Sequence, residues 1–325
     1  MSKANLLKGR RTYRPFSYEQ AYKFWEQQQN AHWIATSVAM GGDVQDWKET
    51  MSEDDKAVLS NILKGFIQTE VVVNDYWSQN VSKWFPHPEI AMMCAAFASM
   101  ESIHTHGYAY LNDTLGIEDY NAFLEEPTAK AKIDRLDDLL SVIDSNDVGQ
   151  IARSLAIFSA FTEGVSLFSS FAFLLNFSRF NRMKGLGQII SYSIKDEALH
   201  SEAGCWLFRT LVEENPHIWT DDLKKDIYEA ARITVALEDA FIDKAFENRE
   251  VEGLTPHDLK MFIRNRANSK LGELGLKTNW KNIDQDALER MSWFDSFSIG
   301  TGIQDFFAGH ETNYSKVGDD FYDMW

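Results

Sequence analysis

Two short stretches decide the fold of this chain: Glu101-Ser-Ile-His104 and, 96 residues later (197 − 101), Glu197-Ala-Leu-His200. Positions i and i+3 lie on one face of an α-helix, about 5–6 Å apart at Cβ, so each Glu-x-x-His pair can bind one metal ion from a single helix. Both motifs lie in apolar stretches with helical spacing, which is typical of buried helices. The repeat therefore predicts a helical protein with metal ligands inside it.

A lone glutamate precedes each motif at a similar distance. Glu70 lies 31 residues before Glu101 (101 − 70), and Glu163 lies 34 residues before Glu197 (197 − 163). A carboxylate on an otherwise apolar helix face is costly unless its charge is offset, and two divalent cations offset four carboxylates by charge count. Four carboxylates and two imidazoles from four helices form the ligand set of a paired-metal site in a helix bundle. We therefore expect these six side chains to meet at one centre.

The simpler explanation of a Glu-x-x-His pair is a glutamate and a histidine on the solvent-facing side of a long helix. A third copy, Glu214–His217, contains Pro216 and falls between expected helices, so we interpret it as coincidental. The other two copies lie in mid-helix at matched distances from a lone glutamate. Only these two are interpreted as metal motifs.

The composition fits one large helical domain. The chain has 325 residues, 44% of them hydrophobic, with only 6 Pro and 18 Gly, so a large core is available and turns are sparsely marked. The net charge of −17 argues against nucleic acid or an anionic membrane as a partner, since both would repel the protein. No apolar run reaches transmembrane length, and the N-terminus lacks an apolar signal-peptide segment. We expect a cytoplasmic protein with reduced, buried thiols at Cys94 and Cys205, its only cysteines.

Helical patterning dominates the chain, and no segment alternates with a period of two. Ser52, Thr220 and Thr255 are expected N-caps, and Gly185 with Gly187 is interpreted as punctuation before a helix. The expected helices span residues 17–30, 52–80, 86–115, 136–143, 145–177, 188–213, 220–248 and 255–271. Because the periodicity is lost near the end of the chain, we expect a single helical domain over residues 1–308 and a flexible acidic tail over residues 309–325.

Tyr108 lies four residues after His104, on the same helix face and one turn along. By spacing alone, the better interpretation is a core tyrosine with a bonded hydroxyl. Beside a di-metal centre, the same position favours a redox-active phenol.

Four segments together resemble the small, radical-generating subunit of class I ribonucleotide reductase, a member of the ferritin-like di-metal carboxylate superfamily. They are Phe66-Ile-Gln-Thr-Glu70-Val-Val-Val-Asn74, Glu101-Ser-Ile-His104-Thr-His-Gly-Tyr108, Thr162-Glu163-Gly164 and Lys195-Asp196-Glu197-Ala-Leu-His200. The similarity covers about residues 17–325 in the family's order. It implies an all-α, ferritin-like helical bundle with additional helices.

The resemblance also implies a role for each matching residue. Tyr108 would hold a stable radical, and Trp33 matches the family tryptophan that passes electrons inward. Asp196 matches the carboxylate that links this tryptophan to His104, and Tyr314 resembles the tail tyrosine that relays the radical outward. Without the resemblance, Trp33, Asp196 and Tyr314 would be interpreted as a core aromatic, a solvated acid and a tail residue. The implied metal ligands are Glu70, Glu101, His104, Glu163, Glu197 and His200.

The implied activity is that of a ribonucleoside-diphosphate reductase small subunit. Two metal ions per chain would activate oxygen and oxidise Tyr108, and the radical would pass to the large subunit, which reduces ribonucleotides to deoxyribonucleotides. The implied partners are a second copy of the chain in a homodimer and the large catalytic subunit, bound through the C-terminal tail. A flavoprotein activator is a further option.

Iron in both positions is the first expectation for the metals, with manganese–iron or two manganese ions as alternatives, since mixed carboxylate–imidazole ligation accommodates either element. Glu70 stands where the family commonly has Asp. Glutamate there is typical of a manganese–iron subgroup that lacks the tyrosine, whereas Tyr108 is present. Ser193, one turn before Glu197, places a hydroxyl near the expected radical pocket.

The main alternative is a ferritin-like di-metal oxidase acting on a small molecule or lipid, which would use the same six ligands. Trp33, Asp196 and the tail bearing Tyr314 favour the reductase subunit, because an isolated oxidase needs neither an exit route nor a docking peptide. An iron-storage protein is typically much shorter and gives Tyr108 no role. A purely structural bundle would leave several carboxylates buried without compensation.

Overall fold

The computed structural model describes residues 5–10, 12–118, 146–247 and 249–299, together with isolated residues between 127 and 144. The helix expected around residues 136–143 falls in the stretch of isolated residues. The proposed domain boundary at residue 308 and the whole of the tail, including Tyr314, lie outside the described part of the chain.

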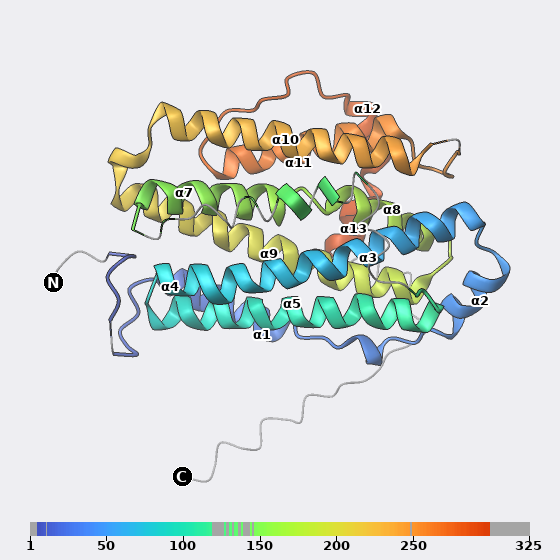
Figure 1. The fold of residues 1–325 in the computed structure, drawn as a ribbon, viewed down its shortest axis with the longest axis horizontal. Helices are drawn as coiled ribbons and strands as arrows, with labels where there is room; N and C mark the ends of the chain where they lie inside the picture. The colour runs from blue at the N-terminus through green and yellow to red at the C-terminus, as the bar shows by residue number, and fades with distance from the viewer. Residues whose placement is uncertain are drawn as a thin grey trace, which may run out of the picture.

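The regular secondary structure in the described part of the chain is helical, and the β-type pairing there is an isolated bridge between Val251 and Leu254. This confirms the expected all-α class. Long helices run side by side along the molecule (Figure 1). They are α3 (Glu53–Asp75), α5 (Pro88–Leu115), α7 (Val148–Ile157), α8 (Phe168–Arg179) and α9 (Lys184–Glu214).

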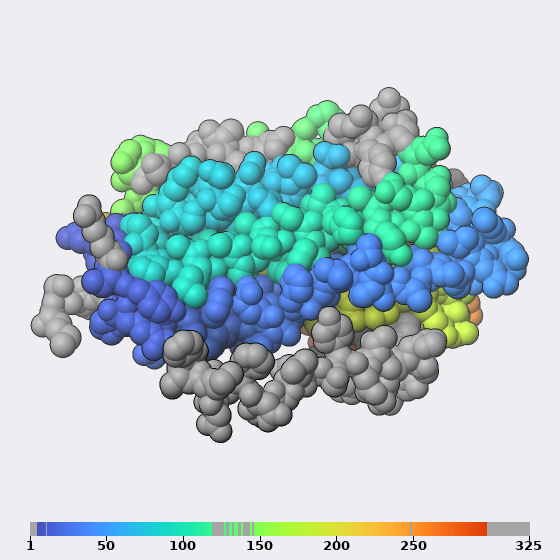
Figure 2. Space-filling model, turned by 90° about the horizontal axis from the view of Figure 1, so that it is seen from below, coloured from blue at the N-terminus to red at the C-terminus, as the bar shows by residue number. Residues whose placement is uncertain are grey.

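Further helices cover this central bundle. On one side lie α10 (Asp221–Ala245) and α11 (Pro256–Glu273), and on the other lies α1 (Glu19–Asn30), packed against α5. Figure 2 shows that side, where the chain that follows α1 runs beside α5 toward α2 (Gly41–Glu49). The remaining short segments are η1 (Ala35–Ser37), η2 (Tyr76–Val81), α4 (Ser82–Trp84), η4 (Phe158–Thr162), η5 (Pro216–Ile218), α12 (Gln285–Met291) and α13 (Trp293–Ile299).

The three predicted N-caps are confirmed. The Ser52 hydroxyl accepts a hydrogen bond from the backbone N–H of Asp55 at 3.1 Å and so caps α3. The hydroxyls of Thr220 and Thr255 accept from backbone N–H groups three residues later and cap α10 and α11. Each bond satisfies one of the N–H groups that the first turn of a helix leaves without a partner.

The interpretation of Gly185 and Gly187 as punctuation was wrong, because both lie inside α9. The carboxylate of Asp43 accepts from the N–H groups of Gly185 (2.9 Å) and Leu186 (2.8 Å), which starts the helix earlier than expected. A Cβ at Gly185 would collide with Met40 Sδ and the backbone of Ala39, so the glycine allows close packing against α2.

The continuous helix expected over residues 145–177 was also wrong, because the chain leaves helical geometry beside Glu163. Helix α7 ends in the π-helical segment η4, in which Glu163 N–H donates to Phe158 O across five residues at 3.0 Å. Ser166 N–H donates to Phe161 O at 2.9 Å in the same way, and regular α-helix resumes at Phe168. Such π-segments are rare and often occur at functional sites.

Glu214, from the third Glu-x-x-His copy that we interpreted as coincidental, stabilises the fold. Its carboxylate accepts from Leu6 N–H and from the Tyr18 hydroxyl, both at 2.7 Å, and so ties the N-terminal arm to the end of α9. His217 lies in η5, on the solvent side. None of the helices in the described residues is long and apolar enough to cross a membrane.

Candidate metal centre

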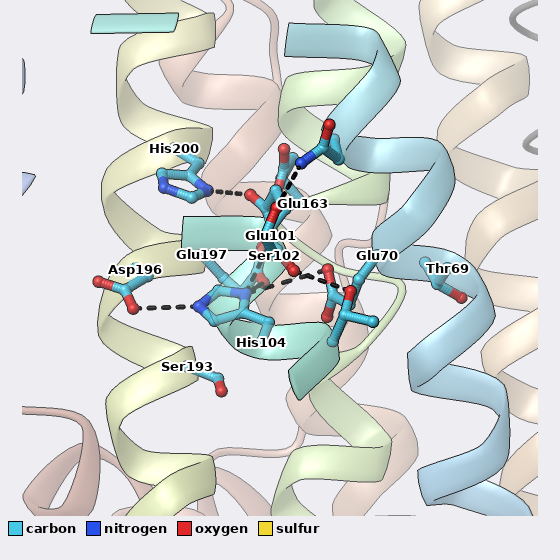
Figure 3. A network of polar contacts seen from close by, with 12 residues as sticks. Thr69, Glu70, Glu101, Ser102, His104, Glu163, Ser193, Asp196, Glu197 and His200 are labelled. Carbon is cyan, nitrogen blue, oxygen red and sulfur yellow. Dashed lines mark hydrogen bonds and ion pairs between the residues drawn. The ribbon is translucent and has the colours of Figure 1, made fainter. Parts of the chain in front are cut away.

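The six predicted ligands converge inside the bundle (Figure 3). Helix α3 contributes one glutamate, α5 and α9 each contribute a Glu-x-x-His pair, and the chain beside η4 contributes the fourth glutamate. All six side chains are at most 1% exposed: Glu70, Glu101, His104, Glu163, Glu197 and His200. The sequence spacing therefore identified a set of residues that meet in space.

The ligand atoms form two overlapping groups, each with its atoms within 4.8 Å of one another. The first metal position is defined by Glu70, His104 and the shared residues Glu101 and Glu197. The second metal position is defined by Glu163, His200 and the same shared residues. Two adjacent positions with shared carboxylates are the arrangement that a pair of metal ions requires.

The inward-facing atoms lack hydrogen-bond partners, which fits a pair of cations. Both carboxylate oxygens of Glu70, Glu101 and Glu197 are buried without a hydrogen bond among the described residues, as are the Nδ1 atoms of His104 and His200. His104 Nδ1 lies 3.0 Å from Glu101 Oε2 and 3.1 Å from Glu197 Oε1. Buried, unpartnered carboxylates are destabilising by themselves, and carboxylate oxygens with imidazole nitrogens suit iron or manganese.

Burial shifts the pKa values of the carboxyl and imidazole groups in this cluster. It raises the pKa of Glu70 and Glu101 to about 7, raises that of Glu197 to about 8, and raises the pKa of Glu163 well above its ordinary value. It lowers the pKa of His200 to about 4, so this imidazole is neutral and able to bind a metal. Metal binding to such carboxyls displaces their protons.

His104 is oriented by a hydrogen-bonded chain that reaches Trp33. Asp196 Oδ2 accepts from Trp33 Nε1 at 2.8 Å and lies 3.0 Å from His104 Nε2. Because a carboxylate only accepts, Nε2 carries the proton and Nδ1 faces the centre. The indole of Trp33 also stacks on the His104 ring at 5.9 Å between centroids. A Cβ at Gly107 would lie 3.2 Å from Trp33 Cη2, so the glycine permits this approach.

Gln28 belongs to the same hydrogen-bonded chain, and sequence reasoning missed it. Its Nε2 donates to Asp196 Oδ1 at 2.8 Å, and its Oε1 lies 2.9 Å from His200 Nε2. The two ligand histidines are therefore linked behind the centre through Asp196 and Gln28. Gln28 is one of three consecutive glutamines in α1, and nothing in its local pattern separates it from its neighbours.

Trp77 is a second residue that sequence reasoning missed. Its Nε1 donates to Glu163 Oε1 at 2.8 Å, which leaves Glu163 Oε2 buried without a hydrogen-bond partner and free to face the second metal position. The only signal available was its place seven residues after Glu70, about two turns along the helix expected over residues 52–80; in the structure it lies in η2, directly after α3.

Tyr108 is fully buried beside the first metal position. Its ring lies 6.3 Å from His104 and 5.0 Å from Phe66 between centroids. Its hydroxyl has no hydrogen-bond partner among the described residues, and burial, with Glu70 as the next contributor, raises its pKa well above the ordinary value. The Ser193 hydroxyl donates to Ile189 O at 3.3 Å, and its proximity to the phenol is a minor contribution that lowers the pKa of Tyr108. Tyr108 is thus a neutral phenol in a largely apolar pocket.

A protein-family description, "Ribonucleotide reductase, small chain", matches residues 10–286. The chain belongs to this family. The membership makes it the small, radical-generating subunit of ribonucleoside-diphosphate reductase, as the resemblance implied, and favours this function over the oxidase and iron-store alternatives. A small subunit acts together with a large subunit.

Relatives of this reductase small subunit span most of the chain. "Probable ribonucleoside-diphosphate reductase small subunit 376L" of Invertebrate iridescent virus 6 is 34% identical and covers 96% of each chain. The reductase subunit beta of Chlamydia pneumoniae is 27% identical over 94% of this chain and 90% of that one.

Solved structures share the fold of this reductase small subunit. The R2 subunit from Clostridium botulinum superposes with a TM-score of 0.76 at 21% identity, over 86% of this chain and 88% of that chain. The dimanganese(II)-NrdF of Streptococcus sanguinis gives 0.75 at 18% identity, over 86% and 98%. The ferritin-like bundle predicted from the sequence is therefore confirmed.

Proposed function

We propose that the six converging residues bind two metal ions and that Tyr108 carries the radical of this subunit. The observation that carries the proposal is the placement of the unbonded phenol, 6.3 Å from the ring of His104 and sealed from solvent. A radical survives longest where water and reductants are excluded, and the buried aromatic Phe66 lines that pocket.

When bound, the two metal ions would supply the redox chemistry that reduces oxygen and makes an oxidising equivalent available, which no side chain of this protein can do. Tyr108 would then give one electron and its hydroxyl proton together to the oxidised centre, because its raised pKa disfavours a phenolate beforehand. Trp33 would pass electrons inward, and this role is supported by its indole, which stacks on His104 and donates to Asp196. Asp196 would hold both rings in place throughout.

For the metals we propose iron in both positions, with manganese–iron or two manganese ions as the alternatives. The donor set of four carboxylates and two imidazoles suits both elements and does not discriminate between them. One protein of similar fold, the NrdF of Streptococcus sanguinis, is a dimanganese(II) protein, which supports manganese as an alternative. Glu70 in place of the commoner Asp supports the manganese–iron alternative, and Tyr108 argues against it.

The proposal is tested by elemental analysis and EPR on one sample. After anaerobic loading with Fe(II), or with Mn(II) and Fe(II), and exposure to air, we expect two metal ions per chain and a tyrosyl radical signal. A protein that holds fewer than two ions under saturating conditions would contradict the di-metal assignment. Two bound ions without any radical would contradict the role of Tyr108 alone.

We further propose that the subunit works in the cytoplasm as a homodimer, docks the large subunit through residues 309–325, and sends the radical outward through Tyr314. The support is the family membership and the match of the tail tyrosine to the family pattern. The buried thiols of Cys94 and Cys205, whose pKa values are raised by burial, are consistent with a reducing compartment. A flavoprotein activator is compatible with manganese in the site.

Deleting residues 309–325 should abolish ribonucleotide reduction with the large subunit and leave the metal content unchanged. The reason is that all six proposed ligands lie between Glu70 and His200 in the sequence, so the deletion should remove docking and the outward route only. Turnover assays and elemental analysis of the truncated chain provide the measurement. A Tyr314→Phe variant is the control for docking, since it should still bind the large subunit. Undiminished turnover by the truncated chain would rule out the tail's role.

A further inference from the structure

The helix break beside Glu163 leaves a backbone carbonyl without its normal partner. In a continuous helix, Gly164 O would accept from the N–H of Phe168, four residues later. Here Phe168 N–H donates to Val165 O at 3.1 Å instead. Gly164 O accepts from the Nε of Arg266, on α11, at 2.7 Å. Arg266 therefore replaces the hydrogen bond that the break removes.

Arg266 is held firmly in this position. Its guanidinium lies over the Phe168 ring, 3.2 Å from the centroid, so the same side chain contacts both ends of the irregular segment. It also lines a polar cavity of about 250 Å³ with Lys270 and Met291. Burial lowers its pKa to about 9, which still leaves the group a cation at neutral pH.

The segment after Glu163 has little room to move. A Cβ at Gly164 would collide with Ala160 O and would lie 2.7 Å from Ser201 Oγ and 2.8 Å from Lys270 Cε. The backbone is thus enclosed by η4, α9 and α11 at the residue next to the ligand. The position of this backbone therefore depends on the side chains of α11 that lie against it, Arg266 and Lys270.

We propose that Arg266 is a positioning residue for the second metal position: its hydrogen bond to Gly164 fixes the helix break that aims Glu163 at the centre. Trp77 holds Glu163 Oε1, and Arg266 holds the adjoining backbone, so Oε2 is directed from two sides. Glu70, Glu101 and His104 reach the first metal position from α3 and α5, whereas Arg266 holds the backbone next to Glu163. The inference rests on the proposed binding of two metal ions.

The test compares Mn(II) binding by Arg266→Met with binding by wild-type protein under anaerobic conditions. Free Mn(II) gives a six-line EPR signal that bound ions lose, so a titration counts the sites and ranks their affinities. We expect the second equivalent to bind about 10–100-fold more weakly and the first to bind as in wild type, as is typical when an outer partner of a ligand is removed. Methionine keeps much of the apolar volume and cannot donate to Gly164 O.

Arg264→Met is the matched control. Arg264 lies two residues away on the same helix and donates twice to Asp239 and once to Lys260 O, so its loss should leave both equivalents unchanged. Arg266→Lys keeps the charge and should fall between Arg266→Met and wild type. If circular dichroism shows that Arg266→Met does not fold, the comparison of Arg266→Lys with wild type decides the question.

Two full-affinity equivalents in a folded Arg266 variant would overturn the proposal, and so would equal weakening of both equivalents. Neither outcome involves the radical, because no oxidant is present in the titration. A wild-type protein that binds fewer than two Mn(II) ions would instead contradict the di-metal assignment on which the inference rests.

Discussion

Replacing Tyr108 by phenylalanine should abolish the tyrosyl radical signal and ribonucleotide reduction while both metal ions stay bound. Phenylalanine keeps the ring that packs against Phe66 and removes only a hydroxyl that has no hydrogen-bond partner, so the fold should lose little stability. The loss of activity should span orders of magnitude, as when a reacting group is deleted. EPR after aerobic loading, turnover with the large subunit and elemental analysis provide the measurements.

Tyr110→Phe is the control for this experiment. Tyr110 lies two residues later on α5, is partly buried, and its hydroxyl donates to Val38 O at 3.5 Å, away from the ligands. Its variant should keep the radical signal. An unchanged signal in Tyr108→Phe would sink the radical assignment, whatever the metal content of that variant.

Replacing Asp196 by asparagine should lower ribonucleotide reduction by about 10–100-fold, the usual effect of losing a partner behind a metal ligand. The carboxylate accepts from Trp33, Gln28 and His104, whereas an amide must turn its NH2 toward at least one of these donors. If Gln28 turns over to compensate, its own NH2 group then faces His200 Nε2. Depending on the orientation of the amide, the mismatch therefore reaches His104 directly or His200 through Gln28. Turnover and Mn(II) affinity are the measurements.

Asp258→Asn is the same chemical change at a buried aspartate outside the site. Asp258 is 3% exposed and pairs with Arg290 at 2.7 Å, so its variant should keep wild-type activity. Wild-type activity in Asp196→Asn would show that the chain from Trp33 to the histidines has no functional role.

The sequence identified the residues that converge at the candidate metal centre because helix geometry links spacing to direction. In Glu101–His104 and Glu197–His200, three residues separate two side chains on one face, and this relation holds in any helix of the bundle. The N-caps followed the same logic, since a hydroxyl at Ser52 satisfies a backbone group that every helix start exposes. Features set within a few residues of one another were therefore predictable.

Features that depend on a distant partner were not. Gln28 is defined by its contacts with residues more than 160 positions away, and its local pattern is that of any polar helix face. The helix break at Glu163 could not be predicted because the apolar periodicity of the sequence continues through it. The hydrogen bond that replaces the lost helical bond comes from Arg266, which is distant in the sequence. Gly185 was misinterpreted because a glycine that ends a helix and one that admits a neighbouring helix look alike in sequence.

The glycine beside Tyr108 has a consequence for evolution as well as for packing. If Trp33 passes electrons inward as proposed, the transfer rate between Trp33 and α5 depends on how closely the indole can lie against this helix, because electron tunnelling weakens exponentially with distance. At Gly107 the missing methyl sets that separation, since a Cβ would lie 3.2 Å from the ring. A residue with no charge, no proton and no metal bond can thus control the kinetics of the subunit, and drift at such a position would change the rate without touching the chemistry.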